Sequence, residues 1–266
     1  MLVKTKGKPM FSPPWIPISR YIRRKSGSAL FRKMQAIRPA QPLISFTFDD
    51  FPRSALLVGG AILRRYGLSG TYYTAFGLMG KDSPSGQICL PDDVRKAFDD
   101  GHELGCHTYS HYDSWQTEPE VFEDSIIQNR IALSDLIPGA QFKSFSFPLS
   151  SPRPMTKRAA ARYFLCCRAG GQTMNFGRAD LNQLSAYFLE KAHGNIQAVA
   201  NLIEKNKDAR GWIIFATHDI CPRPSPYGCT PEFFGEVVQY AVDSGAQILP
   251  VVKALEAIHG NSSSAG

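Results

Sequence analysis

Residues 43–50, LISFTFDD, join an apolar, β-prone run directly to two adjacent carboxylates, Asp49 and Asp50. Burying one carboxylate is costly unless a partner compensates its charge, and a second carboxylate beside it raises that cost. The pair therefore either lies in solvent at the end of a strand or faces a positive charge that another part of the chain supplies.

Segments like this apolar run recur along the chain and alternate with helix-like segments. Strands are expected at 43–48, 70–76, 103–106, 144–147, 163–168, 185–189, 211–217 and 246–250. Helices are expected between them, at 54–67, 91–101, 119–139, 195–208 and 231–244. Repeated β-then-α units imply parallel strands, and about seven such units favour a barrel-like sheet over an open one. With 266 residues, of which 43% are hydrophobic, the chain is long enough for such a domain.

Two histidines follow the strand expected at 103–106, in HTYSH, residues 107–111. On one helical turn, the i, i+4 spacing of His107 and His111 would place both imidazoles within reach of one metal ion. Because functional residues of a barrel lie at the carboxyl ends of its strands, this pair and the two carboxylates are expected on one rim. Two imidazoles and one carboxylate are typical of a catalytic zinc site, and the cation would leave the other carboxylate free as a base. Each pair alone is also compatible with a surface loop or a strand-end turn.

A third polar element ends the strand expected at 211–217. The segment IIFATHDI, residues 213–220, delivers His218 at the end of an apolar run. His218 is therefore a candidate general acid at the same rim, or a strand-terminal histidine followed by a turn.

Taken in order, TFDD at 47–50, HTYSH at 107–111 and THD at 217–219 carry a family resemblance. The chain resembles the polysaccharide deacetylases of carbohydrate esterase family 4, whose core is the NodB homology domain. The resemblance covers most of residues 43–255 and implies a distorted (β/α) barrel with about seven strands.

The resemblance also implies a role for each matching residue. Asp49 would be the general base and His218 the general acid. The ligands of Zn²⁺, or of another divalent transition metal, would be Asp50, His107 and His111. In FSFPLS, residues 145–150, Pro148 matches the family pattern, and the backbone N–H of Leu149 would help to stabilise the oxyanion.

The chain departs from the family pattern at several positions. Phe51 stands where a glycine is usual, and Ser146 stands where the family has the arginine that orients the catalytic aspartate. Leu149 and Ser150 replace a tyrosine and a glycine, and Ala216 replaces a leucine. For the acidic residue that tunes the histidine, Asp180 is the candidate.

The function implied is hydrolysis of the acetyl amide of an N-acetylated sugar in a polysaccharide, an oligosaccharide or a lipid-linked glycan. Removal of O-acetyl groups by the same route stays open. Trp115 and Tyr112, in the polar loop after His111, are the expected substrate contacts. The alternatives are hydrolysis of a small cyclic amide, as in allantoinase-like relatives, and a sugar-binding relative without activity.

The charge of the chain is concentrated at its start. Residues 1–40 hold ten Lys or Arg and no Asp or Glu, which leaves 20 basic and 23 acidic residues for the rest. We therefore expect a basic N-terminal arm, 1–40, before a NodB-like domain, 41–260. Aromatic and aliphatic residues alternate with the basic ones in the arm, which suits contact with an anionic membrane or packing on the domain. A nucleic-acid partner is not expected.

Targeting signals and cysteines bear on the compartment. Lys4, Lys6 and Lys8 are not followed by the apolar region of a secretory signal, and the longest apolar run, WIIFA at 212–216, is too short to span a bilayer. The six cysteines show no C-x-x-C spacing, although Cys221 and Cys229 flank one loop and could pair in an oxidising compartment. These features favour a cytoplasmic protein, with peripheral contact at the inner membrane face as an extension of that hypothesis.

Overall fold

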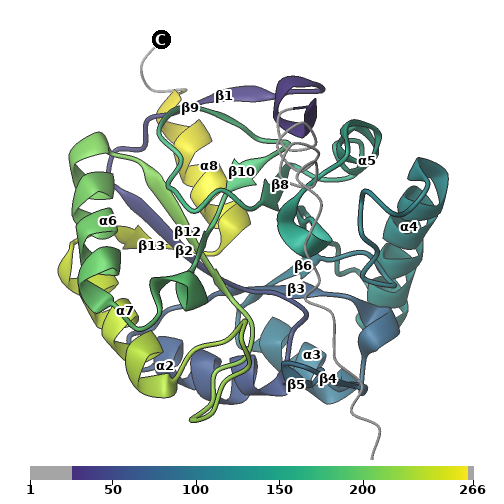
Figure 1. Ribbon diagram of the computed structural model, residues 1–266, viewed down its shortest axis with the longest axis horizontal. Helices are drawn as coiled ribbons and strands as arrows, with labels where there is room; N and C mark the ends of the chain where they lie inside the picture. Colours follow the sequence, from purple (N-terminus) through teal and green to yellow (C-terminus); the bar gives the residue numbers. More distant parts are fainter. Residues whose placement is uncertain (1–25, 263–266) are drawn as a thin grey trace, which may run out of the picture.

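The computed structural model describes residues 26–262 and contains a barrel of parallel strands with helices around it (Figure 1). The strands of the barrel follow one another in the order β10-β8-β7-β6-β3-β2-β12-β11. Their bounds are β2 Leu43–Phe48, β3 Thr71–Thr74, β6 Glu103–Cys106, β7 Ser144–Ser146, β8 Cys166–Ala169, β10 Leu184–Ser185, β11 Tyr187–Phe188 and β12 Trp212–Thr217. A further strand, β13 (Gln247–Ile248), pairs with β2.

The barrel is closed by one extended segment. β10 pairs with β8, β11 pairs with β12, and only Ala186 separates β10 from β11 in the sequence. Counted as one strand, this segment completes a ring of seven. The predicted (β/α) barrel with about seven strands is therefore confirmed.

The helices before α8 lie between successive strands and around them, and α8 follows the last strand, β13 (Figure 1). They are η1 Ala55–Gly60, α2 Ala61–Arg64, α3 Pro91–Asp99, α4 Pro119–Leu136, α5 Pro154–Ala160, α6 Ile196–Ala209, α7 Pro231–Asp243 and α8 Val251–Ser262. The helix expected at 54–67 begins instead with a π-helical turn, η1. Ser54 does not cap it, because its hydroxyl accepts a hydrogen bond from the N–H of Ile220 at 3.3 Å. That bond ties the helix start to the loop after β12.

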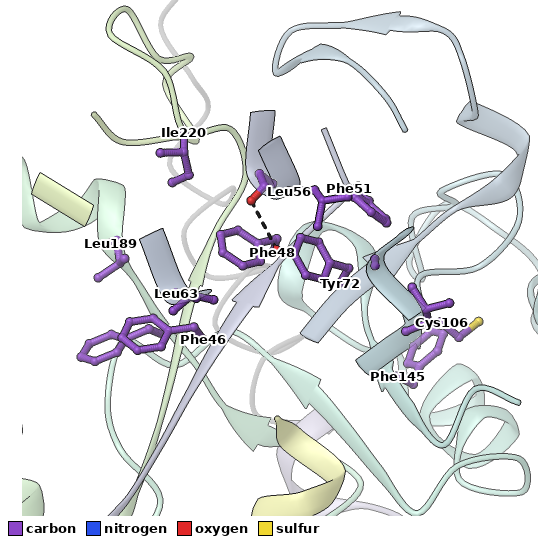
Figure 2. Close-up of a cluster of buried hydrophobic side chains, with 14 of the residues drawn as sticks. Phe46, Phe48, Phe51, Leu56, Leu63, Tyr72, Cys106, Phe145, Leu189 and Ile220 are labelled. Carbon is purple, nitrogen blue, oxygen red and sulfur yellow. Dashed lines mark hydrogen bonds between the residues drawn. The ribbon is translucent and has the colours of Figure 1, made fainter. Parts of the chain in front are cut away.

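Strand alternation separates an outer apolar layer from an inner, partly polar one. On β2, Phe46 and Phe48 point outward into the larger apolar cluster, part of which Figure 2 shows. Ser45 and Thr47 alternate with them along the strand and are also buried, so they face the inside of the barrel. Asp49 continues this inner row, which explains how a strand buried along its whole length delivers a carboxylate inward.

Part of the predicted N-terminal arm belongs to the folded body. Strand β1 (Met34–Ile37) pairs antiparallel with β9 (Gly177–Asp180). Asp180 accepts hydrogen bonds from the N–H of Lys33 at 2.8 Å and from the buried ammonium of Lys157 at 2.6 Å. Lys157 also donates to the carbonyl of Gly27 at 2.9 Å. Asp180 thus anchors this segment, and its interpretation as the partner of His218 is wrong.

Residues 1–25, which hold most of the basic residues of the predicted arm, lie outside the described residues. Within the described part, none of the helices is both long enough and apolar enough to cross a membrane. The six cysteines, Cys221 and Cys229 included, are free thiols.

Candidate active site

The three predicted metal ligands, Asp50, His107 and His111, converge at the carboxyl end of the barrel. Nε2 of His107 lies 3.5 Å from Oδ1 of Asp50, and Nε2 of His111 lies 3.2 Å from the same oxygen. One ligand atom from each residue lies within 4.8 Å of the others. Oδ1 of Asp50 is buried and has no hydrogen-bond partner among the described residues. Because a buried, unpaired carboxylate oxygen is costly, this arrangement fits a divalent cation between two imidazoles and a carboxylate.

His107 and His111 lie in a loop, so the prediction that they share a helical turn is wrong. Thr108 and His111 both have left-handed backbones, with φ of 57° and 54°. The N–H of Tyr112 donates to the hydroxyl of Thr108 at 3.2 Å and closes the loop. The four-residue spacing therefore works through two unusual backbone positions and not through helical periodicity.

Left-handed backbone also explains why Phe51 stands out from the family pattern. Asp50 and Phe51 have φ of 61° and 55°, a region that costs a non-glycine residue about 1–2 kcal/mol. The Phe51 ring is fully buried, and its centre lies 4.6 Å from that of the Tyr72 ring. Figure 2 shows the two side chains next to each other. Burial of a phenyl ring is favourable by a similar or larger amount, so packing offsets the strain that a glycine would avoid.

The protonation of His107 is fixed by its surroundings. Its Nδ1 lies 2.8 Å from the carbonyl oxygen of Ser146, which can only accept, so Nδ1 carries the proton. Nε2 is therefore the unprotonated nitrogen and faces Asp50. Burial lowers the pKa of His107 to about 4, which keeps the ring neutral, as a metal ligand must be.

His218 lies at the end of β12, across Asp50 from the other histidines. Its Nδ1 donates to the carbonyl of Tyr227 at 3.2 Å, and its Nε2 lies 4.0 Å from Oδ2 of Asp50. Because a carbonyl can only accept, Nδ1 carries a proton, and Nε2 is the nitrogen that faces the site. The ring of Tyr227 lies 5.5 Å from that of His218 and is half exposed.

The loop that carries Tyr227 is organised by Asp219, the last residue of the THD motif. Its buried carboxylate accepts from the N–H of Ser225 at 2.8 Å and from its hydroxyl at 2.5 Å. A Cβ at Gly228 would collide with Asp219, so only glycine allows this close approach. Asp219 therefore acts on the site through the carbonyl that orients His218.

Asp49 is buried inside the barrel and has a partner that the sequence patterns missed. The guanidinium of Arg168, on β8, binds its Oδ1, and the hydroxyl of Ser146 lies 3.4 Å from the same oxygen. Burial alone would raise the pKa of Asp49, but Arg168 and the three nearby histidines hold it below its ordinary value. A signal was present, because an arginine inside the apolar segment YFLCCRA, 163–169, requires a buried carboxylate partner.

A second missed residue is Glu190, which follows β11. Burial raises its pKa to about 7, and the charges of His218 and Asp49 both act on it. Its Oε2 is buried and has no hydrogen-bond partner among the described residues. Glu190, and not Asp180, is the carboxyl group that the fold brings toward His218.

The predicted substrate contacts lie at the rim. Leu149 follows Pro148 in a short turn after β7, has φ of 56°, and exposes 65% of its surface. Tyr112 is 36% exposed, whereas Trp115 is half-buried with its backbone N–H bonded to Asp113 at 2.8 Å. Their contact with substrate stays a prediction.

Comparison with known proteins gives a family match over part of the chain. Residues 36–164 match the family model described as polysaccharide deacetylase. None of the curated proteins matches the chain significantly.

Solved structures share the fold at low identity. The Xyl-CE4 domain of a multidomain xylanase from the hindgut metagenome of Trinervitermes trinervoides has a TM-score of 0.58 and 19% identity, over 81% of this chain and 90% of that one. A family 4 acetyl xylan esterase from Clostridium thermocellum, in complex with a cobalt ion, has a TM-score of 0.57 and 22% identity, over 80% and 90%. The chitin deacetylase of the fungal pathogen Colletotrichum lindemuthianum has a TM-score of 0.57 and 17% identity, over 82% and 89%.

Proposed function

Because this chain belongs to the polysaccharide deacetylase family, we propose that it is a metal-dependent hydrolase of N-acetylated sugars. The substrate would be part of a polysaccharide, an oligosaccharide or a lipid-linked glycan. The observation that carries the proposal is the buried, unpaired oxygen of Asp50 between His107 and His111. A candidate base, Asp49, and a candidate acid, His218, flank this oxygen.

The donor set of one carboxylate and two neutral imidazoles suits Zn²⁺ or a similar divalent transition metal. When bound, such an ion supplies polarisation of the substrate carbonyl and a more acidic water. The chain itself supplies the fixed Nε2 lone pair of His107, through the bond from its Nδ1 to Ser146.

The remaining steps use residues of the chain. Asp49 takes a proton from the attacking water, since Arg168 keeps its carboxylate ionised and in place. The N–H of Leu149 donates to the oxyanion, and His218 gives a proton from Nε2 to the departing nitrogen. The C–N bond breaks, and acetate and the amino sugar leave.

One experiment distinguishes the proposed function from the two alternatives, a cyclic amidase and a sugar-binding relative without activity. Purified protein, depleted of metal and resupplied with Zn²⁺, is assayed for acetate release from acetylated chito-oligosaccharides and acetylated xylan, and for ring opening of allantoin. Release of acetate from the N-acetylated glycans supports the proposal. Allantoin hydrolysis alone would identify a cyclic amidase, and binding of glycans without release of any product would identify a sugar-binding relative.

The proposed membrane contact rests on the charge of the arm. We infer a cytoplasmic enzyme whose residues 1–25 contact an anionic membrane surface. Three of the ten basic residues of 1–40, Arg32, Lys33 and Arg38, lie in the described body, and the seven others precede residue 26. The contact is therefore assigned to these seven residues, which no acidic residue offsets.

A further inference from the structure

The carboxylate of Asp49 is held from one side only. Among the described residues, both of its side-chain contacts, from Arg168 and from the hydroxyl of Ser146, are made by Oδ1. These contacts leave Oδ2 available, and the nearby His107, His111 and His218 act electrostatically on the same carboxylate. A base must present one oxygen in a fixed direction, and this arrangement provides that direction.

Arg168 is itself fixed by its surroundings. It is 1% exposed, and its guanidinium carbon lies 4.9 Å from the ring centre of Tyr73 and 5.7 Å from that of Phe188. Gly105 makes room for the Tyr73 ring, because a Cβ there would collide with it. The two rings therefore restrict the guanidinium to one position beneath Asp49.

Stability alone does not account for this ion pair. Nε and Nη1 of Arg168 are buried without hydrogen-bond partners among the described residues. Replacing a buried ion pair by apolar residues of the same volume is often neutral or stabilising, and unpaired donors add to the cost of the pair. Its cost is consistent with a role in the reaction.

We propose that Arg168 is the positioning residue for the base Asp49, and that it acts from β8 in place of an arginine at position 146 on β7. This inference rests on the proposed function. Ser146 and Arg168 are direct register partners on the two adjacent strands, so a side chain from either position points to the same part of the barrel interior. The serine at 146 leaves the space that the arginine at 168 occupies.

The first experiment separates positioning from folding. Arg168→Met should lower kcat for acetate release about 100-fold, with KM within about threefold and the bound metal unchanged, because the base is misplaced while the metal ligands are not. Arg162→Met, which removes a surface arginine paired with Glu123, is the matched control and should keep kcat. A wild-type kcat for Arg168→Met would overturn the inference.

The second experiment relocates the arginine. Arg168→Ser should be as inactive as Arg168→Met, and adding Ser146→Arg to it should restore kcat at least about tenfold. Arg168→Met should have no further effect on the residual kcat of Asp49→Asn, because the two residues act as a unit. Failure of the relocated arginine to restore kcat, together with additive losses, would contradict the inference.

The pair can also be tested without activity. If wild-type protein releases no acetate, the proposed function fails. Urea unfolding of Asp49→Asn, Arg168→Met and the double variant then tests whether Asp49 and Arg168 are energetically coupled. If the two residues are coupled, the urea midpoint of the double variant should be no lower than that of the less stable single variant. Additive shifts in the midpoint would overturn the inference.

Discussion

The two ends of the barrel each hold a carboxyl group inside the fold, and they treat it differently. At the amino end, Glu103 begins β6 and has three donors: the hydroxyls of Ser144 and Thr71 and the N–H of Val252 at 2.8 Å. At the carboxyl end, Oδ1 of Asp50 has no hydrogen-bond partner within the described chain. Glu103 caps the start of α8, whereas Asp50 requires a partner that residues 26–262 do not supply.

The comparison shows that a buried carboxyl group alone does not mark a functional site. Burial raises the pKa of Glu103, while that of Asp49 is held below its ordinary value because Arg168 and the histidines outweigh burial. A satisfied group with no cation beside it is structural, and an unsatisfied one within a ring of imidazoles indicates a ligand.

The largest effect is expected from loss of the metal ligands. His107→Ala or His111→Ala removes one of three donors, so bound zinc and acetate release should both fall to background. Elemental analysis and the acetate assay measure this. His259→Ala, in α8, is a control that should leave both unchanged. Undiminished metal content in both variants would show that these histidines do not bind the metal. The proposed difference between Asp50 and Glu103 would then be lost.

Variants of the two adjacent carboxylates should behave differently in the metal analysis and in the acetate assay. Asp49→Asn removes a base but no ligand, so turnover should fall by at least about 100-fold while the metal stays bound. Asp50→Asn should weaken metal binding itself. Identical behaviour of the two variants in both assays would show that the assigned division of roles is wrong.

A substitution at Glu103, at the amino end of the barrel, should lower the stability of the protein and leave catalysis unchanged. Glu103→Ala leaves the N–H of Val252, in the first turn of α8, and two hydroxyls without an acceptor, so the free energy of unfolding should fall by about 1–3 kcal/mol. The kcat of the folded fraction should stay at the wild-type value. A loss of kcat as large as that of Asp49→Asn would mean that the two ends are coupled.

Acid should also act on the amino end, through His102. Its Nδ1 accepts the N–H of Gly70 at 3.0 Å, and burial lowers its pKa from 6.5 to about 4. Since the unfolded chain binds this proton first, the contribution to stability is complete above pH 6.5 and falls as the pH drops toward 4, by at most roughly 3 kcal/mol. His102→Gln should make stability fall less steeply across this window in urea unfolding. An unchanged slope would show that His102 is not kept neutral.

The smallest effect is expected from the N-terminal residues. Deletion of 1–25 spares β1 and the carbonyl of Gly27 that Lys157 binds, so the body should stay folded and active on soluble substrate. Co-sedimentation with anionic vesicles at low salt should be lost, since each basic residue contributes about 1 kcal/mol near such a surface. Full-length protein that does not bind these vesicles would contradict the membrane contact.

Much of the fold could be predicted from the sequence because β2 and β12 are long, apolar and followed by polar residues. The same pattern placed the Asp49–Asp50 pair, the two histidines and His218 at strand ends. Short strands such as β1 and β9 lack this signal, since β1 lies in a basic segment and β9 is largely polar.

The rest of the site depends on register and on backbone conformation, which a linear pattern does not contain. The position of Arg168 beneath Asp49 follows from the pairing of β7 with β8. The left-handed backbone at Phe51 becomes intelligible only with the buried ring of Tyr72 beside it. Glu190 approaches His218 because β11 pairs with β12.

Titration of metal-depleted protein with Zn²⁺, followed by acetate release from an acetylated chito-oligosaccharide, tests whether Asp50, His107 and His111 form one metal site that activity requires. We expect no activity without metal, a linear rise as Zn²⁺ is added, and a break at about one equivalent per chain, since these residues form one site. His111→Ala should show no such break. Full acetate release by protein that contains no metal would show that hydrolysis does not need an ion at this site.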